Sequence, residues 1–144
     1  MKVLFCFGPN LGALGAREPE RYGTQTLAEL MGEVADLADR LGHEVEWRQS
    51  DHEGDLVGWL LSAAGDGFDA VVVNPGALAH YSYALRDAVE GCSAPVVEVH
   101  MTNIYAREGF RRHSVISPVC RATIVGLGAG GYHLALQALP WITG

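Results

Sequence analysis

The sequence VLFCFGPN, residues 3–10, is an unbroken apolar run that is stopped by a turn signal. Apolar side chains at every position from Val3 to Phe7 predict a strand that is buried on both faces. Gly8, Pro9 and Asn10 favour turns, so the strand is expected to end there. A strand covered on both faces is typical of a parallel sheet between two layers of helices.

Working outward, strands and amphipathic helices alternate along the whole chain. Apolar residues fall at helical spacing from Thr26 to Leu41, and Gly42 favours the end of that helix. Further strands are expected at 44–49, 69–74, 95–100 and 122–125, and further helices behind a cap at Asp55, at 82–90 and at 132–139. This order predicts a flavodoxin-like, doubly wound, five-stranded parallel sheet with helices on both faces.

Length and composition indicate one compact unit. The 144 residues, 49% of them hydrophobic, suit a single domain spanning residues 1–144. The net charge of −7 argues against partners that need a broad basic face, so we expect neither nucleic-acid nor membrane binding. A small anionic ligand stays open, because Arg107, Arg111 and Arg112 cluster in the sequence.

The cysteines and the apolar segments bear on the compartment. Cys6, Cys92 and Cys120 lack the spacing of a disulfide framework or a zinc site, which suits reduced thiols. No segment has the core of a signal peptide or the length of a membrane span. We therefore expect a soluble cytoplasmic protein.

Polar side chains mark the ends of three predicted strands. Asn10 follows the first strand, Asn74 ends the third, and Glu98 and His100 close the fourth. In an open parallel sheet, ligands bind beyond the carboxyl ends of the strands, so these side chains could converge in one crevice. Each asparagine alone is more typical of a turn. Their convergence is what predicts a site.

Glu98 is the residue least expected in a buried strand. It lies among Val96, Val97 and Val99, so its carboxylate needs a partner. Residues two apart on a strand share a face, which places His100 beside it. The carboxylate can hold the imidazole protonated or in one tautomer, as a general acid or a hydrogen-bonding clamp requires. The alternative is a structural polar pair.

The connection over residues 12–23 is long for a strand-to-helix loop and contains Arg17, Arg21 and Tyr22. Long loops in compact domains are often functional lids. A tyrosine acts as a base near neutrality only when nearby cations stabilise its phenolate, and Arg17 and Arg107 are candidates. The alternative is a mobile surface loop with solvated arginines.

Two further motifs suggest a cofactor or a metal but do not fit their context. Residues 126–131, GLGAGG, match a dinucleotide-binding pattern, yet only 13 residues follow, too few for the next strand and its acidic residue. We interpret them as a close-packed turn. Residues 51–55, DHEGD, lack a recognised metal-ligand spacing, so helix capping and subunit contacts explain them better. We predict neither a metal nor an organic cofactor.

Five segments, in order, resemble the type II 3-dehydroquinate dehydratases. They are FGPNLGALGAREPERYGTQTL, QSDHEGDL, VNPGALAHYSYALRDA, VVEVHMTNIYAREGFRRHSVISP and GLGAGGYHLAL, which together account for most of the chain. The resemblance implies a flavodoxin-like subunit, assembled as a dodecamer of four trimers. It also implies a shikimate-pathway enzyme that converts 3-dehydroquinate to 3-dehydroshikimate by anti elimination of water through an enolate.

The resemblance implies catalytic roles for five residues. Tyr22 would remove the proton beside the ketone, with Arg17 on the same lid. Asn10 would position a water at the enolate oxygen. His100, oriented by Glu98, would protonate the departing hydroxyl.

The other residues that the resemblance implies would contact the substrate. They are Asn74, Gly76 and Ala77 lining the pocket, Met101 and Thr102 holding the carboxylate through backbone amides, His80 and Arg111 on the hydroxyls, Arg107 near the tyrosine, and Asp87 reaching a neighbouring subunit's site. Three positions depart from the usual pattern: Asp51 replaces an Asn, Thr102 replaces a Ser, and residues 78–81, LAHY, replace a stretch with Tyr and Thr around the His. Thr102 keeps a hydroxyl and matters least, and the other two departures leave open the assembly contacts or the preference at the pocket edge.

Two alternatives to this interpretation stay open to different degrees. An enzyme of the same fold that acts on an amino analogue of dehydroquinate would keep the same residues, and a biosynthetic or a quinate-degrading role would also look alike. A flavin-binding or phosphorylated signalling module fits less well, because Asn10 and Asn74 stand where a receiver needs acidic residues. Lys2 is the only lysine, at the start of the first strand, so no buried lysine can form an imine.

Overall fold

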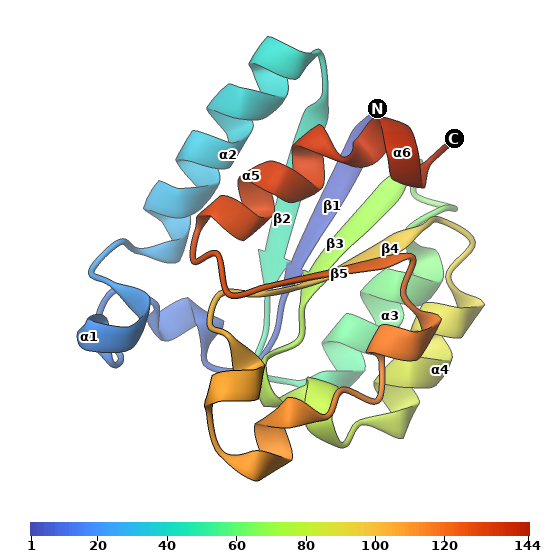
Figure 1. Ribbon diagram of the computed structural model, residues 1–144. Helices are drawn as coiled ribbons and strands as arrows, with labels where there is room; N and C mark the ends of the chain where they lie inside the picture. Colours follow the sequence, from blue (N-terminus) through green and yellow to red (C-terminus); the bar gives the residue numbers. More distant parts are fainter.

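A five-stranded parallel sheet lies at the centre of the computed structural model, which describes residues 1–144 (Figure 1). Its strands are β1 (Lys2–Phe7), β2 (Glu44–Gln49), β3 (Ala70–Asn74), β4 (Val96–His100) and β5 (Ala122–Val125). They lie in the order β2-β1-β3-β4-β5, and every neighbouring pair is parallel. This is the flavodoxin-like order, so the predicted fold class is confirmed.

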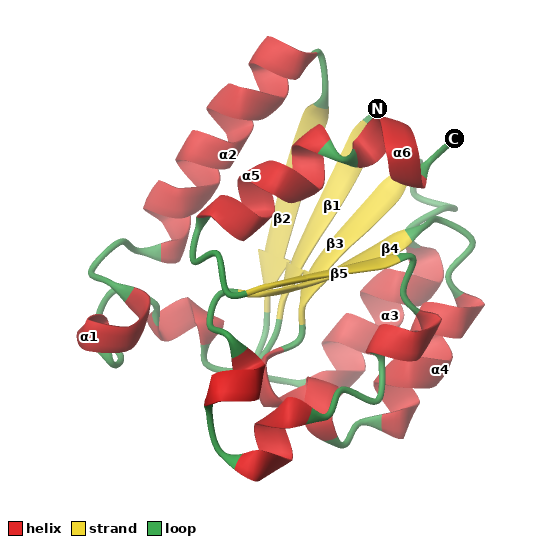
Figure 2. Cartoon of the chain, viewed as in Figure 1, coloured by secondary structure: helices red, strands yellow, loops and turns green.

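Helices cover both faces of the sheet (Figure 2). α2 (Leu27–Leu41), α5 (Gly130–Gln137) and α6 (Leu139–Ile142) lie on one face, and α3 (Glu53–Ser62) and α4 (Tyr83–Gly91) lie on the other. The connections hold α1 (Pro19–Tyr22) and five 3₁₀ helices, which are η1 (Leu11–Ala13), η2 (Gly76–His80), η3 (Ile104–Ala106), η4 (Gly109–Arg112) and η5 (Ser117–Val119). None of the helices combines the length and the apolar character that crossing a bilayer requires.

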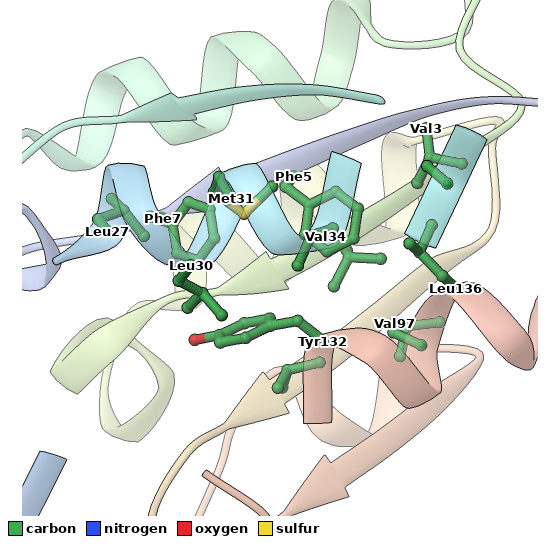
Figure 3. Close-up of a cluster of buried hydrophobic side chains, with 14 of the residues drawn as sticks. Val3, Phe5, Phe7, Leu27, Leu30, Met31, Val34, Val97, Tyr132 and Leu136 are labelled. Carbon is green, nitrogen blue, oxygen red and sulfur yellow. The ribbon is translucent and has the colours of Figure 1, made fainter. Parts of the chain in front are cut away.

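The side chains of β1 alternate between two separate cores. Val3, Phe5 and Phe7 pack with α2 and α5 in one cluster of buried residues (Figure 3), whereas Leu4 and Cys6 pack with α3 and α4 in another. Successive strand residues point to opposite faces, so a run without polar residues supplies both cores at once. The prediction that this strand is buried on both faces is confirmed.

The sequence defines α2 most sharply. Thr26 Oγ1 accepts a hydrogen bond from the Glu29 N–H, and the Glu29 carboxylate accepts one from the Thr26 N–H, both over 3.2 Å. This capping box satisfies two donors at the helix start. Gly42 ends the helix with φ of 75°, a left-handed conformation that suits glycine. Both predicted ends are confirmed.

Two predicted helix starts are wrong. α3 begins at Glu53 with His52 at the N-cap position, so Asp55 is not the cap. Asp55 lies in the first turn, where its carboxylate accepts a 2.5 Å hydrogen bond from Ser50 Oγ. α5 begins at Gly130 rather than Tyr132. α3 begins with Glu-Gly-Asp and α5 begins with Gly-Gly, so neither start shows apolar periodicity.

The glycine-rich stretch 126–131 is a turn that runs into the first residues of α5. Gly126 has a left-handed φ of 87°, and a Cβ atom at Gly131 would lie only 3.0 Å from Val99 Cγ1. The interpretation of this stretch as a close-packed turn is confirmed.

The turns after β1 and β3 are packed directly against each other. The Gly8 N–H donates to the Asn74 carbonyl over 2.8 Å. A Cβ atom at Gly8 would lie 2.5 Å from the Pro75 carbonyl oxygen, and one at Gly76 would lie 3.0 Å from that of Pro9. Glycine is therefore required at both positions, and the two strand ends form one rigid unit beneath the site.

Candidate active site

A cavity of about 200 Å³ opens beyond the carboxyl ends of β1, β3 and β4, at the lower edge of the sheet in Figure 1. Six of its 16 lining residues are hydrophobic, and the others are mostly polar or charged. Such a mixed lining suits a small polar ligand. The cavity lies at the edge where a doubly wound sheet binds its ligands.

Twelve of the fourteen residues singled out from the sequence line this cavity. They are Asn10, Arg17, Tyr22, Asn74, Gly76, Ala77, His80, His100, Met101, Thr102, Arg107 and Arg111. Glu98 is hydrogen-bonded to His100 behind the cavity wall. Asp87 is exposed on α4 and does not line the cavity of its own chain.

His100 and Glu98 form a buried pair at the end of β4. His100 Nε2 lies 2.7 Å from Glu98 Oε1, and Glu98 is 0% exposed. Burial by itself raises the pKa of Glu98, but hydrogen bonds from His100, Ser117 and Ser114 outweigh it and hold the pKa below its ordinary value. An ionised carboxylate only accepts, so Nε2 carries a hydrogen and Nδ1 is the ring nitrogen on the cavity side.

Tyr22, the last residue of α1, lies between two arginines. Its hydroxyl oxygen accepts a 2.9 Å hydrogen bond from Arg107 Nη1, which also lies 3.4 Å from Thr102 Oγ1. The guanidinium carbons of Arg17 and Arg107 each lie 5.9 Å from the centroid of the tyrosine ring. A guanidinium group only donates hydrogen bonds and is always charged. This arrangement stabilises negative charge on the Tyr22 oxygen.

The carboxamide of Asn74 is fixed at both ends. Its Nδ2 donates to the Tyr132 hydroxyl over 2.7 Å, and its Oδ1 accepts from the Gly76 N–H over 3.1 Å. Tyr132 belongs to the core shown in Figure 3, and burial raises its pKa well above the ordinary value while the Asn74 hydrogen bond acts in the other direction. The second Nδ2 hydrogen of Asn74 is left for a ligand in the cavity.

Asn10 enters the cavity wall from a left-handed turn, with φ of 71°. Its N–H donates to Asp51 Oδ1 over 2.8 Å, and Gln49 Nε2 donates to the same oxygen over 3.1 Å. Asp51, a departure from the family pattern, therefore supports the turn that presents Asn10. Glu53 accepts a 2.6 Å hydrogen bond from Ser82 Oγ. Structural hydrogen bonds thus occupy the acidic residues of the DHEGD segment.

His80 and Arg111 complete the polar wall. His80 Nδ1 lies 2.9 Å from the His113 carbonyl oxygen and must donate to it, and the ring stacks on His100 at a centroid distance of 6.3 Å. Burial lowers the pKa of His80, and the His113 carbonyl only partly opposes this. A neutral His80 leaves Nε2 as an acceptor. Arg111 Nε is held by Glu108 over 2.6 Å.

Two groups of residues, one lining the cavity and one behind its wall, were missed in the sequence. The first is its apolar wall, made of Pro9, Leu11, Leu14 and Ile104. The second consists of hydroxyls that contact Glu98, from Ser114, Ser117 and Thr123. The signal for the second group was present, because a buried glutamate needs several hydrogen-bond donors and two serines follow closely in the sequence.

Comparison with known proteins agrees with this geometry over nearly the whole chain. Residues 1–140 match the family described as Dehydroquinase class II. The chain belongs to this family. It is therefore a dehydroquinase, an enzyme of the hydro-lyase class, and the resemblance noted in the sequence is confirmed.

Individual relatives of this dehydroquinase cover it almost end to end. It is 53% identical to a 3-dehydroquinate dehydratase of Pelotomaculum thermopropionicum, over 100% of this chain and 99% of that protein. Its identity to the 3-dehydroquinate dehydratase of Bacillus subtilis is 52%, over 92% of this chain and 88% of the other. The crystal structure of the type II dehydroquinase from Propionibacterium acnes matches with a TM-score of 0.92 and 46% identity, over 99% of this chain and 95% of that one.

Proposed function

We propose that the chain dehydrates 3-dehydroquinate to 3-dehydroshikimate by anti elimination through an enolate. Family membership and the two named dehydratases support the overall reaction. One observation carries the mechanism. A tyrosine oxygen that accepts from Arg107 lines the same cavity as a histidine that is paired with a buried carboxylate. A base and an acid therefore reach one ligand from separate elements.

Tyr22 begins the reaction as the base. Its phenolate takes the proton beside the ketone, the electron pair of that C–H bond forms the carbon–carbon double bond of the enolate, and the π pair of the carbonyl moves onto the ketone oxygen. Arg107 and Arg17 stabilise the phenolate beforehand through the contacts described above. Asn10 positions a water that donates to the enolate oxygen.

His100 completes the elimination. The enolate reforms the ketone, the new double bond forms, and the bond from carbon to the departing hydroxyl breaks while His100 Nδ1 donates a proton to it. Water leaves, and the proton held by Tyr22 returns to His100 through solvent. Glu98 stabilises the charged imidazole before the step and keeps Nδ1 toward the cavity.

The rest of the cavity binds the substrate. Its carboxylate lies on the backbone amides of Met101 and Thr102, and His80 and Arg111 contact its hydroxyls. Asn74, Gly76 and Ala77 form the wall that the interlocked turns hold in place. The reaction uses neither a metal nor a cofactor. An imine route is closed by position, because Lys2 lies at the amino end of β1, 3.0 Å from Glu46.

Asp87 contributes to the active site of a neighbouring subunit. The enzyme assembles as a dodecamer of four trimers. It acts in the cytoplasm, in the biosynthesis of aromatic compounds. Asp87 lies on the exposed side of α4, outside its own cavity, so it can act only on another copy. Sedimentation analysis should give a mass that is a multiple of three subunits. A fully active monomer would contradict the shared site.

The Tyr22→Phe variant tests the mechanism. It removes the base and little else, so kcat should fall by roughly 10²- to 10⁴-fold while KM stays close to the wild-type value. Exchange of the proton beside the ketone with deuterated water, followed by NMR, should be lost in this variant and kept in His100→Ala. Exchange at the wild-type rate in Tyr22→Phe would falsify the assignment. Turnover on an amino analogue, measured in parallel, separates the rival substrate.

A further inference from the structure

Glu98 accepts hydrogen bonds from four side chains although it is completely buried. His100 Nε2 and Ser114 Oγ lie 2.7 and 2.8 Å from Oε1. Ser117 Oγ and, more distantly, Thr123 Oγ1 at 3.4 Å contact Oε2. His100 lines the cavity, whereas the three hydroxyl groups lie away from it.

This number of potential donors favours an ionised carboxylate. A carboxylate offers about four acceptor positions on its two oxygens, and all of them are used here. Protonation of Glu98 would take up one of these acceptor positions, so one of the four contacts would be lost or a hydroxyl would have to turn and accept. A buried polar group without a partner is costly, so the surroundings oppose protonation.

We propose that Ser114, Ser117 and Thr123 form a hydroxyl cradle that holds Glu98 as an anion, so that Glu98 can fix His100 for the acid step. The three hydroxyls are positioning residues, since none of them touches the substrate. The proposal rests on the proposed function, because that function gives His100 its role as the acid.

The backbone that carries Ser114 and Ser117 is anchored by buried residues between them. Val115 and Ile116, which stand between them, are buried in the core beneath α3 and α4, and the Val115 N–H donates to the Ala79 carbonyl over 2.7 Å. This apolar anchor fixes the hydroxyls on either side of it. Ser114 Oγ also accepts from the Ser117 N–H over 3.1 Å, whereas the Ser117 hydroxyl contacts Glu98 alone. Ser117 is therefore the cleanest position to change.

Few other titratable groups lie near Glu98. Cys120 is one of them. Burial, and to a lesser extent the charge of Glu98, raises the pKa of the Cys120 thiol to about 12. Burial keeps His80, which stacks on His100, mainly neutral. Among these groups, Glu98 is the one that the three hydroxyls contact directly.

The test is Ser117→Ala in the full-length enzyme. Losing one hydrogen bond to a buried anion should reduce kcat roughly tenfold on the acid side of the optimum, move the acid limb of the kcat profile to higher pH, and change KM by less than about twofold. Ser117→Thr, which keeps a hydroxyl, should restore the profile. Thr123→Val should shift it less, because its contact is longer.

Ser62→Ala is the matched control, since it removes a 2.9 Å hydroxyl contact to the exposed carboxylate of Asp66, far from the cavity. Its profile should equal that of the wild type. An independent readout is the ¹³C signal of the Glu98 carboxyl group, which should protonate at higher pH in Ser117→Ala than in the wild type, whether or not the enzyme turns over.

Unchanged ¹³C titration and an unchanged acid limb in Ser117→Ala would overturn the cradle, as would equal losses in the alanine and threonine variants. If Ser117→Ala does not fold, Thr123→Val carries the same two measurements with the same reading. A wild-type enzyme that does not dehydrate 3-dehydroquinate is a different failure. It would refute the proposed function, while the ¹³C titration would still decide on the cradle.

Discussion

Replacing Arg107 should show how much the charge beside Tyr22 contributes to catalysis. The Arg107 side chain is only 8% exposed, and it makes the one protein hydrogen bond to the Tyr22 oxygen. In Arg107→Gln the charge and that 2.9 Å bond are both lost, although a polar group of moderate length remains. The phenolate form of Tyr22 then lacks its principal stabilising partner.

The size of the effect follows from the contact. A hydrogen bond to a charged group contributes roughly 1.5–3 kcal/mol. The attraction between unit charges about 4 Å apart is roughly 4 kcal/mol in the partly screened environment of a protein surface. A loss of about 2–4 kcal/mol in the transition state corresponds to a roughly 30- to 900-fold fall in kcat. Arg107→Lys keeps the charge but not the planar donor geometry, so its loss should be intermediate.

The assay is steady-state kcat and KM, together with exchange of the proton beside the ketone. Arg112→Gln is the control, because Arg112 is an exposed arginine of η4 that does not line the cavity. Its kcat should stay within about twofold of the wild type. A fall of less than about threefold in Arg107→Gln, or an equal fall in the glutamine and lysine variants, would show that the charge beside Tyr22 is not what activates it.

Three further outcomes are expected. The folded-state pKa of Glu98 lies below its unfolded value of about 4.3, so its contribution to stability is complete above that pH and is lost as the pH falls through the folded pKa. Urea midpoints measured against pH should therefore decline less steeply in acid for Glu98→Gln than for the wild type. Identical slopes would contradict this. Tyr132→Phe leaves the buried Nδ2 of Asn74 without its acceptor, which should lower the free energy of unfolding by about 1–3 kcal/mol and raise KM. An unchanged KM would mean that the tyrosine does not orient Asn74. Sodium borohydride with substrate should not inactivate the enzyme, since Lys2 is the only lysine, and substrate trapped covalently on the protein would exclude the enolate route.

The fold could be predicted where one face or both faces of an element are apolar. The run from Val3 to Phe7 and the helix from Thr26 to Gly42 were assigned correctly, because burial and capping leave a direct pattern in the residues. Helix starts at Glu53 and Gly130 were not, because tertiary contacts rather than periodicity determine them. The short 3₁₀ helices have no sequence period of their own.

The site could be predicted only in part from the residues themselves. Strand ends in a parallel sheet meet at one edge, so the convergence of Asn10, Asn74 and His100 follows from topology. The contact between Tyr22 and Arg107 spans 85 positions and joins the end of α1 to the segment between η3 and η4, so no local pattern predicts it. The need of a phenolate for a nearby cation made Arg107 a candidate, and the family resemblance also implied that it lies near the tyrosine. Neither route pointed to Tyr132, whose ring is buried in the core and whose hydroxyl contacts Asn74 from α5.

The distribution of primary amines has a practical consequence for handling the enzyme. The α-amino group of Met1, 3.3 Å from His43 Nδ1, and the side chain of Lys2 both lie at the amino edge of the sheet, while the cavity opens at the carboxyl edge (Figure 1). Amine-reactive coupling to a solid support would therefore tether each subunit by the same end. The active face would point to the solution, away from the coupled amines.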